Sequence, residues 1–233
     1  MRISGATALV TGANRGLGRH FATNLLARGA TVYAAARRPE LVDVPGAEVV
    51  RLDITDPASV AAAARTATGV NLLVNNAGIA TGAELVGGDL DLIRAEMDTH
   101  FWGTLSVIRA FAPGLAGGAI LNVLSALSWF ASPGNGAYAS AKAAQWNLTN
   151  AVRGELAAQR TQVTGLFLGA AATDMTAGKD VPEHLLADPA AVVGAALDGL
   201  EAGRWEVLAD ETAAMVKGSL AGDPQAFYSA IGA

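Results

Sequence analysis

The chain has 233 residues, of which 52% are hydrophobic and 16% charged, and its formal net charge is −5. This composition excludes a disordered protein, and the scattered basic residues offer no surface suited to nucleic acid. Because cysteine is absent, disulfides, thiolate metal sites and a thiol nucleophile are excluded, which fits a cytoplasmic protein. No apolar run reaches the roughly 18 residues of a membrane span, so no membrane association is expected.

Short apolar runs alternate with longer helical patterns along the chain. The expected strands are residues 6–10, 31–36, 48–52, 71–75, 119–124, 162–168 and 205–209. The expected helices between them are residues 15–28, 57–67, 89–112, 137–160 and 189–202. Strands that are apolar throughout are typical of a parallel sheet covered on both faces. The sequence therefore predicts an α/β fold, a Rossmann-like, doubly wound and mainly parallel seven-stranded sheet with helices on both faces.

The stretch TGANRGLG, residues 11–18, joins the first expected strand to the first helix and contains Gly12, Gly16 and Gly18. Glycines allow a tight turn and a close approach of the backbone to a pyrophosphate, whose charge suits the N–H groups at a helix start. The spacing G-x-x-x-G-x-G differs from the commoner fingerprint G-x-G-x-x-G, and an ordinary glycine loop is the alternative. Its position between strand and helix favours a dinucleotide site.

The second expected strand ends in AAARRPE, which bears on the choice of nucleotide. A fold that binds NAD usually has a carboxylate about 20 residues beyond the glycines, to bind the ribose 2′-hydroxyl. Here Ala36 is followed by Arg37 and Arg38. Arg37 together with Arg15 of the glycine turn would hold a 2′-phosphate, so we expect NADP(H) rather than NAD(H). Simple exposure to solvent is the alternative, and it suits Arg38 best.

The helix expected at 137–160 carries Tyr138 and Lys142. A spacing of four places both side chains on one face of a helix. A neighbouring ammonium stabilises phenolate and lowers the pKa of a tyrosine, which would make the pair a tuned acid and base. In the alternative interpretation, Tyr138 packs the helix and Lys142 is a solvated charge.

Four motifs occur in a fixed order on these elements: T-G-x-x-x-G-x-G at 11–18, N-N-A-G at 75–78, a serine after the fifth strand, and Y-x-x-x-K at 138–142. With this order and spacing, the chain resembles the short-chain dehydrogenase/reductase family from about residue 5 to residue 209. Because no repeat or linker interrupts the sequence, residues 1–233 are interpreted as a single dinucleotide-binding and catalytic domain.

The resemblance implies roles for individual residues. Tyr138 would be the general acid or base, Lys142 would lower its pKa and bind the nicotinamide ribose, and Ser125 would polarise a carbonyl group. Ser128 is the nearby alternative to Ser125. The positions that the resemblance assigns to the cofactor are Gly12, Asn14, Arg15, Gly16, Leu17, Gly18, Arg37, Asp53, Ile54, Asn76, Ala77, Gly78, Tyr138, Lys142 and Thr173.

Two positions depart from the family pattern. His100 stands where the family has an asparagine that holds a proton-relaying water. Three interpretations are open: a working relay with its own pH dependence, a weakened catalyst, or a packed residue whose relay is supplied by water alone. Leu168 stands where a proline is common before Gly169, which is expected to loosen that loop. His20 and His184 have no partners for a metal site, so no metal is expected.

The substrate is expected above Tyr138, in a pocket lined by Leu127, Trp129, Phe130 and Met175. Such apolar lining suits a hydrophobic or aromatic carbonyl compound or alcohol, although the same residues would also serve as core or subunit contacts. The resemblance implies a homodimer or homotetramer joined through helices 89–112 and 137–160. The tail 209–233 has an amphipathic pattern and would pack either on its own domain or on a neighbour.

The leading functional prediction is an NADPH-dependent oxidoreductase that reduces a ketone or aldehyde to an alcohol, reversibly. One alternative is an NADP(H)-binding sensor or scaffold with little turnover, motivated by His100. Another is reduction of an imine or enone in the same site. Retention of Ser125, Tyr138 and Lys142 favours the enzyme over the pure binder.

Overall fold

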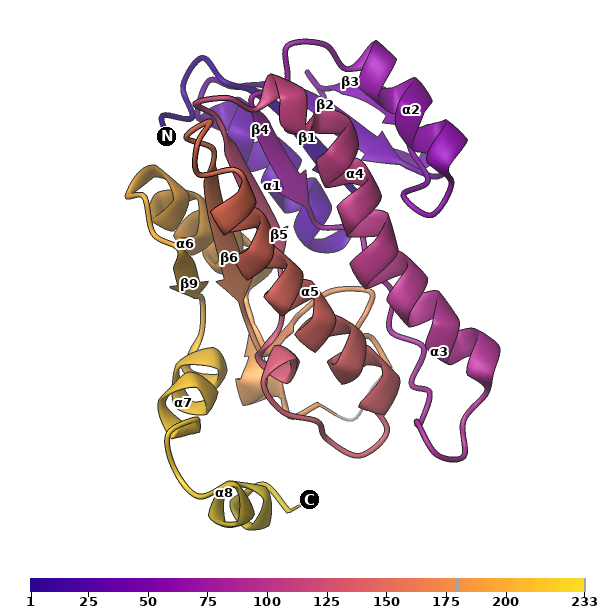
Figure 1. Ribbon diagram of the computed structural model, residues 1–233, viewed down its shortest axis with the longest axis vertical. Helices are drawn as coiled ribbons and strands as arrows, with labels where there is room; N and C mark the ends of the chain where they lie inside the picture. The colour runs from indigo at the N-terminus through magenta and orange to yellow at the C-terminus, as the bar shows by residue number, and fades with distance from the viewer. Residues whose placement is uncertain (179–180, 233) are drawn as a thin grey trace.

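A computed structural model of the chain describes residues 1–178 and 181–232. Its centre is a seven-stranded sheet in the order β3-β2-β1-β4-β5-β6-β9, in which all neighbours run parallel (Figure 1). The strands are β1 (Thr7–Thr11), β2 (Thr31–Ala36), β3 (Glu48–Arg51), β4 (Leu72–Asn75), β5 (Ala119–Val123), β6 (Gln162–Phe167) and β9 (Glu206–Leu208). The predicted α/β fold is confirmed, and the observed sheet is parallel throughout.

The strands are buried on both faces, which explains their unbroken apolar sequences. In β1, Ala8 and Val10 face one core, whereas Leu9 faces the other. Helices α1 and α6 cover the first face, and α2, α4 and α5 cover the second, where α4 and α5 lie across the near side of the sheet in Figure 1. These helices are α1 (Gly16–Ala27), α2 (Pro57–Thr66), α4 (Thr104–Phe111), α5 (Gly136–Glu155) and α6 (Pro189–Glu201).

The helix expected over 89–112 is continuous but not uniform. It comprises α3 (Leu90–Met97), a π-helical turn (Asp98–Gly103) and α4. A π turn accommodates one extra residue, is rare, and often lies at a functional site. Its buried residues include His100. No apolar spacing or residue type marks such a turn in advance, so the sequence predicted a plain α-helix.

The C-terminal tail forms α7 (Glu211–Ser219) and α8 (Pro224–Ala230), beyond the carboxyl end of β9 (Figure 1). Ala213 and Val216 are buried against Leu124 and Phe167, so α7 packs on its own domain. The structure also contains a short sheet of β7 (Ala170–Ala171) and β8 (Leu186–Ala187). Two-residue strands are too short to leave a sequence pattern, and the sequence did not predict them.

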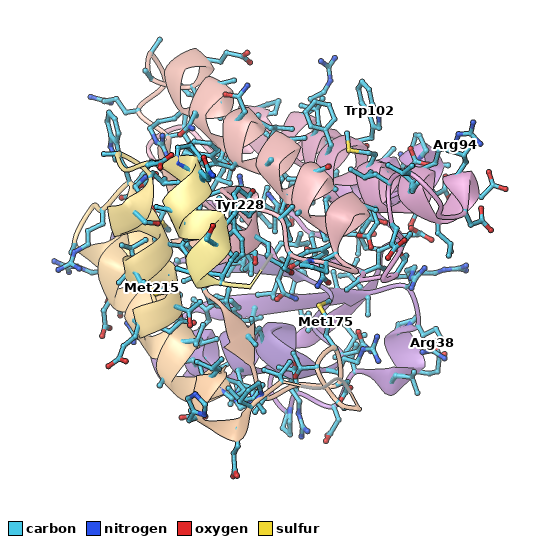
Figure 2. All side chains as sticks on the ribbon, turned by 90° about the horizontal axis from the view of Figure 1, so that it is seen from below. Arg38, Arg94, Trp102, Met175, Met215 and Tyr228 are labelled. Carbon is cyan, nitrogen blue, oxygen red and sulfur yellow. The ribbon has the colours of Figure 1, made fainter. Side chains whose placement is uncertain are left out.

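The described part of the chain contains no helix with both the length and the apolar character needed to cross a bilayer. On the α3–α4 helix, Trp102 and Arg94 stand on the outer surface (Figure 2), and Trp102 is 57% exposed. The predicted homo-oligomer through this helix and α5 stays a prediction.

Replacing Val216 with Asp should lower the free energy of unfolding by about 3 kcal/mol, because a carboxylate would be buried without a partner beneath α7. Met215→Asp is the matched control, since the Met215 side chain, one residue before Val216, is 58% exposed (Figure 2). It should cost less than about 1 kcal/mol. Urea unfolding of both variants measures the difference. Equal losses would contradict the packing of α7 on the domain.

Candidate active site

A cavity of about 540 Å³ opens at the carboxyl ends of the strands. The strand order reverses between β1 and β4, and in a doubly wound sheet ligands bind in the crevice at such a switch point. Segments that follow β1 to β6 contribute lining residues, so the topology assembles the site from pieces far apart in the sequence.

The glycine turn lies at one end of this cavity. Gly12 has φ +67° and Gly16 has φ +51°, a backbone conformation that side chains disfavour. A Cβ on Gly12 would lie 3.0 Å from the Cα of Ala77, and a Cβ on Gly18 would collide with the carbonyl oxygen of Gly12. Gly18 therefore permits close packing of α1 on the turn, and its contact with a cofactor stays a prediction. The exposed backbone of this turn fits a pyrophosphate group.

The N-N-A-G segment is tied directly to the glycine turn. The Thr11 hydroxyl accepts hydrogen bonds from the backbone N–H groups of Asn76 and Ala77, both at 3.0 Å. The side-chain amide of Asn76 donates to the carbonyl oxygen of Thr11 at 2.9 Å. Asn76, Ala77 and Gly78 line the cavity, as do Asp53 and Ile54 after β3. Two motifs separated in sequence therefore form one wall.

Three arginines give this end of the cavity a positive charge. Arg15, Arg37 and Arg38 all line it, and Arg38 is exposed to solvent, as the alternative interpretation expected. The guanidinium of Arg15 lies 3.7 Å from the carboxylate of Asp174, and both side chains are largely exposed. An exposed ion pair of this kind contributes little stability, so Arg15 is available to a phosphate. Thr173 lies beside Gly16 and also lines the cavity.

Ser125 and Tyr138 lie at the other end of the cavity, together with Lys142. The Ser125 hydroxyl accepts from the backbone N–H of Leu127 at 3.1 Å, and the residue is 4% exposed. Ser128 is also buried, and its hydroxyl accepts from the backbone N–H of Ser125 at 3.3 Å. Ser128 therefore closes the turn that presents Ser125, which favours Ser125 as the serine that meets a ligand.

Lys142 is only 4% exposed, and hydrogen bonds hold its amine. Nζ donates to the carbonyl oxygen of Val123 at 2.8 Å and to Oε1 of Gln145 at 2.9 Å. Gln145 in turn donates to the Thr104 hydroxyl at 3.0 Å. The alternative of a solvated surface lysine is wrong. Nζ lies 5.7 Å from the centre of the Tyr138 ring, so the two side chains are neighbours, as the spacing predicted.

The protonation behaviour of the pair differs from the prediction. Burial raises the pKa of Tyr138 above its ordinary value, although the Ser125 hydroxyl opposes this shift and the charge of Glu96 adds to it. Burial lowers the pKa of Lys142 to about 7, against the opposing charge of Glu96. Burial outweighs the opposing hydrogen bond, so the net pKa of Tyr138 is raised, whereas the sequence predicted a lowered pKa. Tyr138 is therefore a protonated phenol at neutral pH.

His100 is fully buried and lines the same cavity as Ser125, Tyr138 and Lys142. Its Nε2 lies 2.9 Å from the carbonyl oxygen of Ile79 and 3.2 Å from Oε2 of Glu96. Its ring meets that of Tyr138 edge to face, with 5.3 Å between centres. Sequence reasoning missed Glu96, although its position four residues before His100 on one helix face was a usable signal.

The substrate end has a mixed lining. Leu127, Phe130 and Met175 line the cavity as predicted. Trp129 instead stacks on Phe167, with 4.2 Å between ring centres, and packs in the core beneath α7. Its assignment to the substrate pocket is therefore corrected. Neighbouring residues in a tight turn point in different directions, and the sequence alone does not show which of them face the cavity. The polar residues Ser132 and Asn135 also line the cavity.

The loop that follows β6 is tied on both sides. The carbonyl oxygen of Leu168 accepts from the backbone N–H of Ala126 at 2.8 Å. The backbone N–H of Gly169 donates to the Asp210 carboxylate at 2.7 Å. These two bonds restrain the loop beside Leu168, and one of them comes from Asp210 at the start of α7.

Comparison with known proteins identifies the family. The family model described as short chain dehydrogenase matches residues 6–183. The chain therefore belongs to the short-chain dehydrogenase/reductase family of oxidoreductases, the class that its fold and site define.

Several relatives are informative. A gluconate 5-dehydrogenase of Gluconobacter oxydans is 34% identical, over 80% of this chain and 77% of its own. An NADPH-dependent 1-acyldihydroxyacetone phosphate reductase of Schizosaccharomyces pombe is 33% identical over 71% of this chain, which spans only 60% of that enzyme. Among solved structures, a short chain dehydrogenase from Burkholderia cenocepacia in complex with NADP is 39% identical, with a TM-score of 0.93 and 98% of both chains covered.

Replacing Gly18 with Ala should lower the free energy of unfolding by about 2 kcal/mol or more, because the new methyl group would collide with the Gly12 carbonyl. Gly194→Ala in α6 is the matched control, since its Cβ would meet no described atom within 4 Å. That change should stabilise the protein by about 0.5–1 kcal/mol. Thermal and urea unfolding measure both. Two stabilised variants would contradict the close packing of α1 on the turn.

Proposed function

We propose that this protein is an NADP(H)-dependent oxidoreductase that reduces a ketone or aldehyde to an alcohol, and catalyses the reverse oxidation. The observation that carries the proposal is the convergence of Ser125, Tyr138 and Lys142 at one end of a cavity whose other end is a glycine turn with three arginines. The cofactor supplies or accepts a hydride when bound. The protein provides binding, orientation and the proton.

Tyr138 is the proton donor in the reductive direction. As the carbonyl oxygen gains negative charge, the phenol hydroxyl transfers its proton to that oxygen, which yields the alcohol. Burial keeps the Tyr138 hydroxyl protonated, which suits a donor. Ser125 lines the same end, and its hydroxyl donates a hydrogen bond to the carbonyl oxygen and polarises it. The walls formed by Leu127, Phe130 and Met175 exclude water and favour an apolar substrate.

Lys142 supports the proton transfer by charge and by binding. Two of its N–H bonds are directed to Val123 and Gln145, so the third is available to the ribose of the cofactor. With a pKa of about 7, its charge is present on the acid side of neutrality and stabilises the phenolate that Tyr138 becomes after donating its proton.

The arginines support a preference for NADP(H). Arg37 follows β2, where a carboxylate would select the unphosphorylated ribose, and Arg15 and Arg38 line the same end of the cavity. Guanidinium groups bind phosphate through charge-assisted hydrogen bonds. The similar Burkholderia cenocepacia protein was solved with NADP, whereas a 3-ketoacyl-(acyl-carrier-protein) reductase from Brucella melitensis, 26% identical with a TM-score of 0.80, was solved with NADH.

A second candidate function is an NADP(H)-binding sensor with little turnover. It is motivated by His100, which stands where the family has an asparagine and which is buried against Tyr138. The two candidates differ in one observable, because a sensor binds NADPH without consuming it when carbonyl compounds are supplied.

Replacing Tyr138 with Phe should reduce turnover at least 100-fold while NADPH affinity stays within about 2-fold, because only the proton donor is lost. NADPH consumption at 340 nm across ketones, aldehydes, imines and enones provides the measurement, with NADPH fluorescence for binding. Tyr33→Phe is the matched control, since Tyr33 lies in the core under α2 and should retain turnover. If the Tyr138 variant remains active, the acid role is wrong. If the unmodified protein binds NADPH and turns over none of the panel, the sensor takes precedence.

Replacing Arg37 with Asp should lower the ratio of kcat/KM for NADPH to that for NADH at least 10-fold, because a carboxylate would repel the 2′-phosphate and accept from the free hydroxyl. Arg51→Asp makes the same change of charge on the exposed face of the neighbouring strand β3, and should leave the ratio unchanged. An unaltered ratio in Arg37→Asp would place the 2′-phosphate elsewhere.

A further inference from the structure

A buried carboxylate lies behind the catalytic residues. Glu96 and His100 are both fully buried, and they face each other across the junction of α3 and the π-helical turn. Glu96 Oε1 accepts from the backbone N–H of Thr81 at 2.6 Å, and Oε2 lies 3.2 Å from Nε2 of His100. Two buried ionisable groups are costly unless they are paired, so this pair requires a reason beyond packing.

The hydrogen-bond pattern defines the state of His100. Nε2 faces two acceptors, the carbonyl oxygen of Ile79 and the carboxylate of Glu96, so Nε2 carries the hydrogen. Among the described residues, Nδ1 has no hydrogen-bond partner. A second proton there would be a buried donor without an acceptor, and burial together with the charge of Lys142 lowers the pKa of His100. His100 is therefore neutral and has its lone pair on Nδ1.

Contacts connect this pair to the catalytic residues. Gly78 gives the imidazole room, because a Cβ there would lie 2.7 Å from its Cε1. The ring of His100 lies edge to face with that of Tyr138, at 5.3 Å, and Nζ of Lys142 lies 5.7 Å from the same tyrosine ring. Glu96, His100, Tyr138 and Lys142 thus form a contiguous row of titratable side chains, which we name the charge row.

We propose that Glu96 is a positioning residue: as the anionic end of the charge row, it anchors His100 through Nε2 and serves as counter-charge to the buried ammonium of Lys142. The catalytic consequence rests on the proposed function, whereas the electrostatic role does not. A glutamine amide does not replace it, because its single oxygen can occupy only one of the two positions held by Oε1 and Oε2, and its NH2 group would face a donor at the other.

The charges around Lys142 determine the direction of the effect. The titratable groups that interact with the row come from three elements: Glu96 of α3, His100 of the π turn, and Tyr138 and Lys142 of α5. Burial raises the pKa of Glu96, but hydrogen bonds from His100 and Thr81 outweigh burial and hold it below its ordinary value, so the carboxylate is ionised. A negative charge raises the pKa of both an ammonium and a phenol. Removing it must lower both.

The first test measures Lys142 directly, without cofactor or turnover. Lysine occurs only at Lys142, Lys179 and Lys217, so ¹³Cε-lysine labelling gives few signals, and Lys142→Arg assigns the relevant one. In Glu96→Gln, the pH midpoint of the Lys142 signal should fall by about 0.5 to 1 pH unit relative to the unmodified protein. Asp98→Asn removes one exposed charge from the same helix and should leave the midpoint unchanged.

The second test uses the pH dependence of carbonyl reduction. Glu96→Gln should lower kcat about 10-fold and move both limbs of the kcat profile to lower pH. Glu96→Asp retains the charge but withdraws the carboxylate from His100, so it should lower kcat with the Lys142 midpoint held within about 0.3 pH unit. This variant also keeps the proposal testable if Glu96→Gln does not fold.

The outcomes separate the proposals. A folded Glu96→Gln protein with an unchanged Lys142 midpoint would overturn the counter-charge role. Glu96 would then only help to fix the backbone of residues 79–81. A midpoint that shifts equally in Asp98→Asn would also overturn it. If the midpoint falls as expected but no carbonyl compound is reduced by the unmodified protein, the counter-charge role stands and the proposed function fails.

Discussion

The burial of the Lys142 amine constrains the half of the structure that holds Ser125 and Tyr138. A buried charge is tolerated only where hydrogen bonds and other charges compensate for lost water. The Lys142 amine donates to Val123, at the end of β5, and to Gln145, which lies on α5 like Lys142 itself. Gln145 in turn donates to Thr104 of α4. These bonds fix the end of one strand against two helices. The position of the amine therefore depends on this whole half of the structure, not on the helix that carries it.

The cavity is built by two different means. At the end with the glycine turn, backbone conformation makes the site, since Gly12 and Gly16 adopt positive φ and line the cavity. At the reaction end, side chains make the site, and their protonation depends on burial and on one another. A side chain can be exchanged more readily than a backbone path, so the departure at His100 coexists with an unaltered glycine turn.

The C-terminal tail and the π-helical turn each position residues that line the cavity. Asp210, at the start of α7, holds Gly169 in the loop over the cavity, where the proline expected before that glycine is replaced by Leu168. The π turn presents His100 to Tyr138, and Gly78 removes the side chain that would obstruct it. In each case a departure from the family sequence is accompanied by a specific contact that accommodates it.

The sequence by itself determined the order of strands and helices, the glycine turn and the residues Ser125, Tyr138 and Lys142. The elements and the glycine turn rest on local properties: apolar runs, helical spacing and the conformational freedom of glycine. The three catalytic candidates rest on the resemblance to the family. Only the tertiary structure decided that Trp129 packs in the core, that Glu96 partners His100, and that burial raises the pKa of Tyr138. Those outcomes depend on the solvent and charges that each side chain meets after folding, and segments distant in the sequence supply many of them.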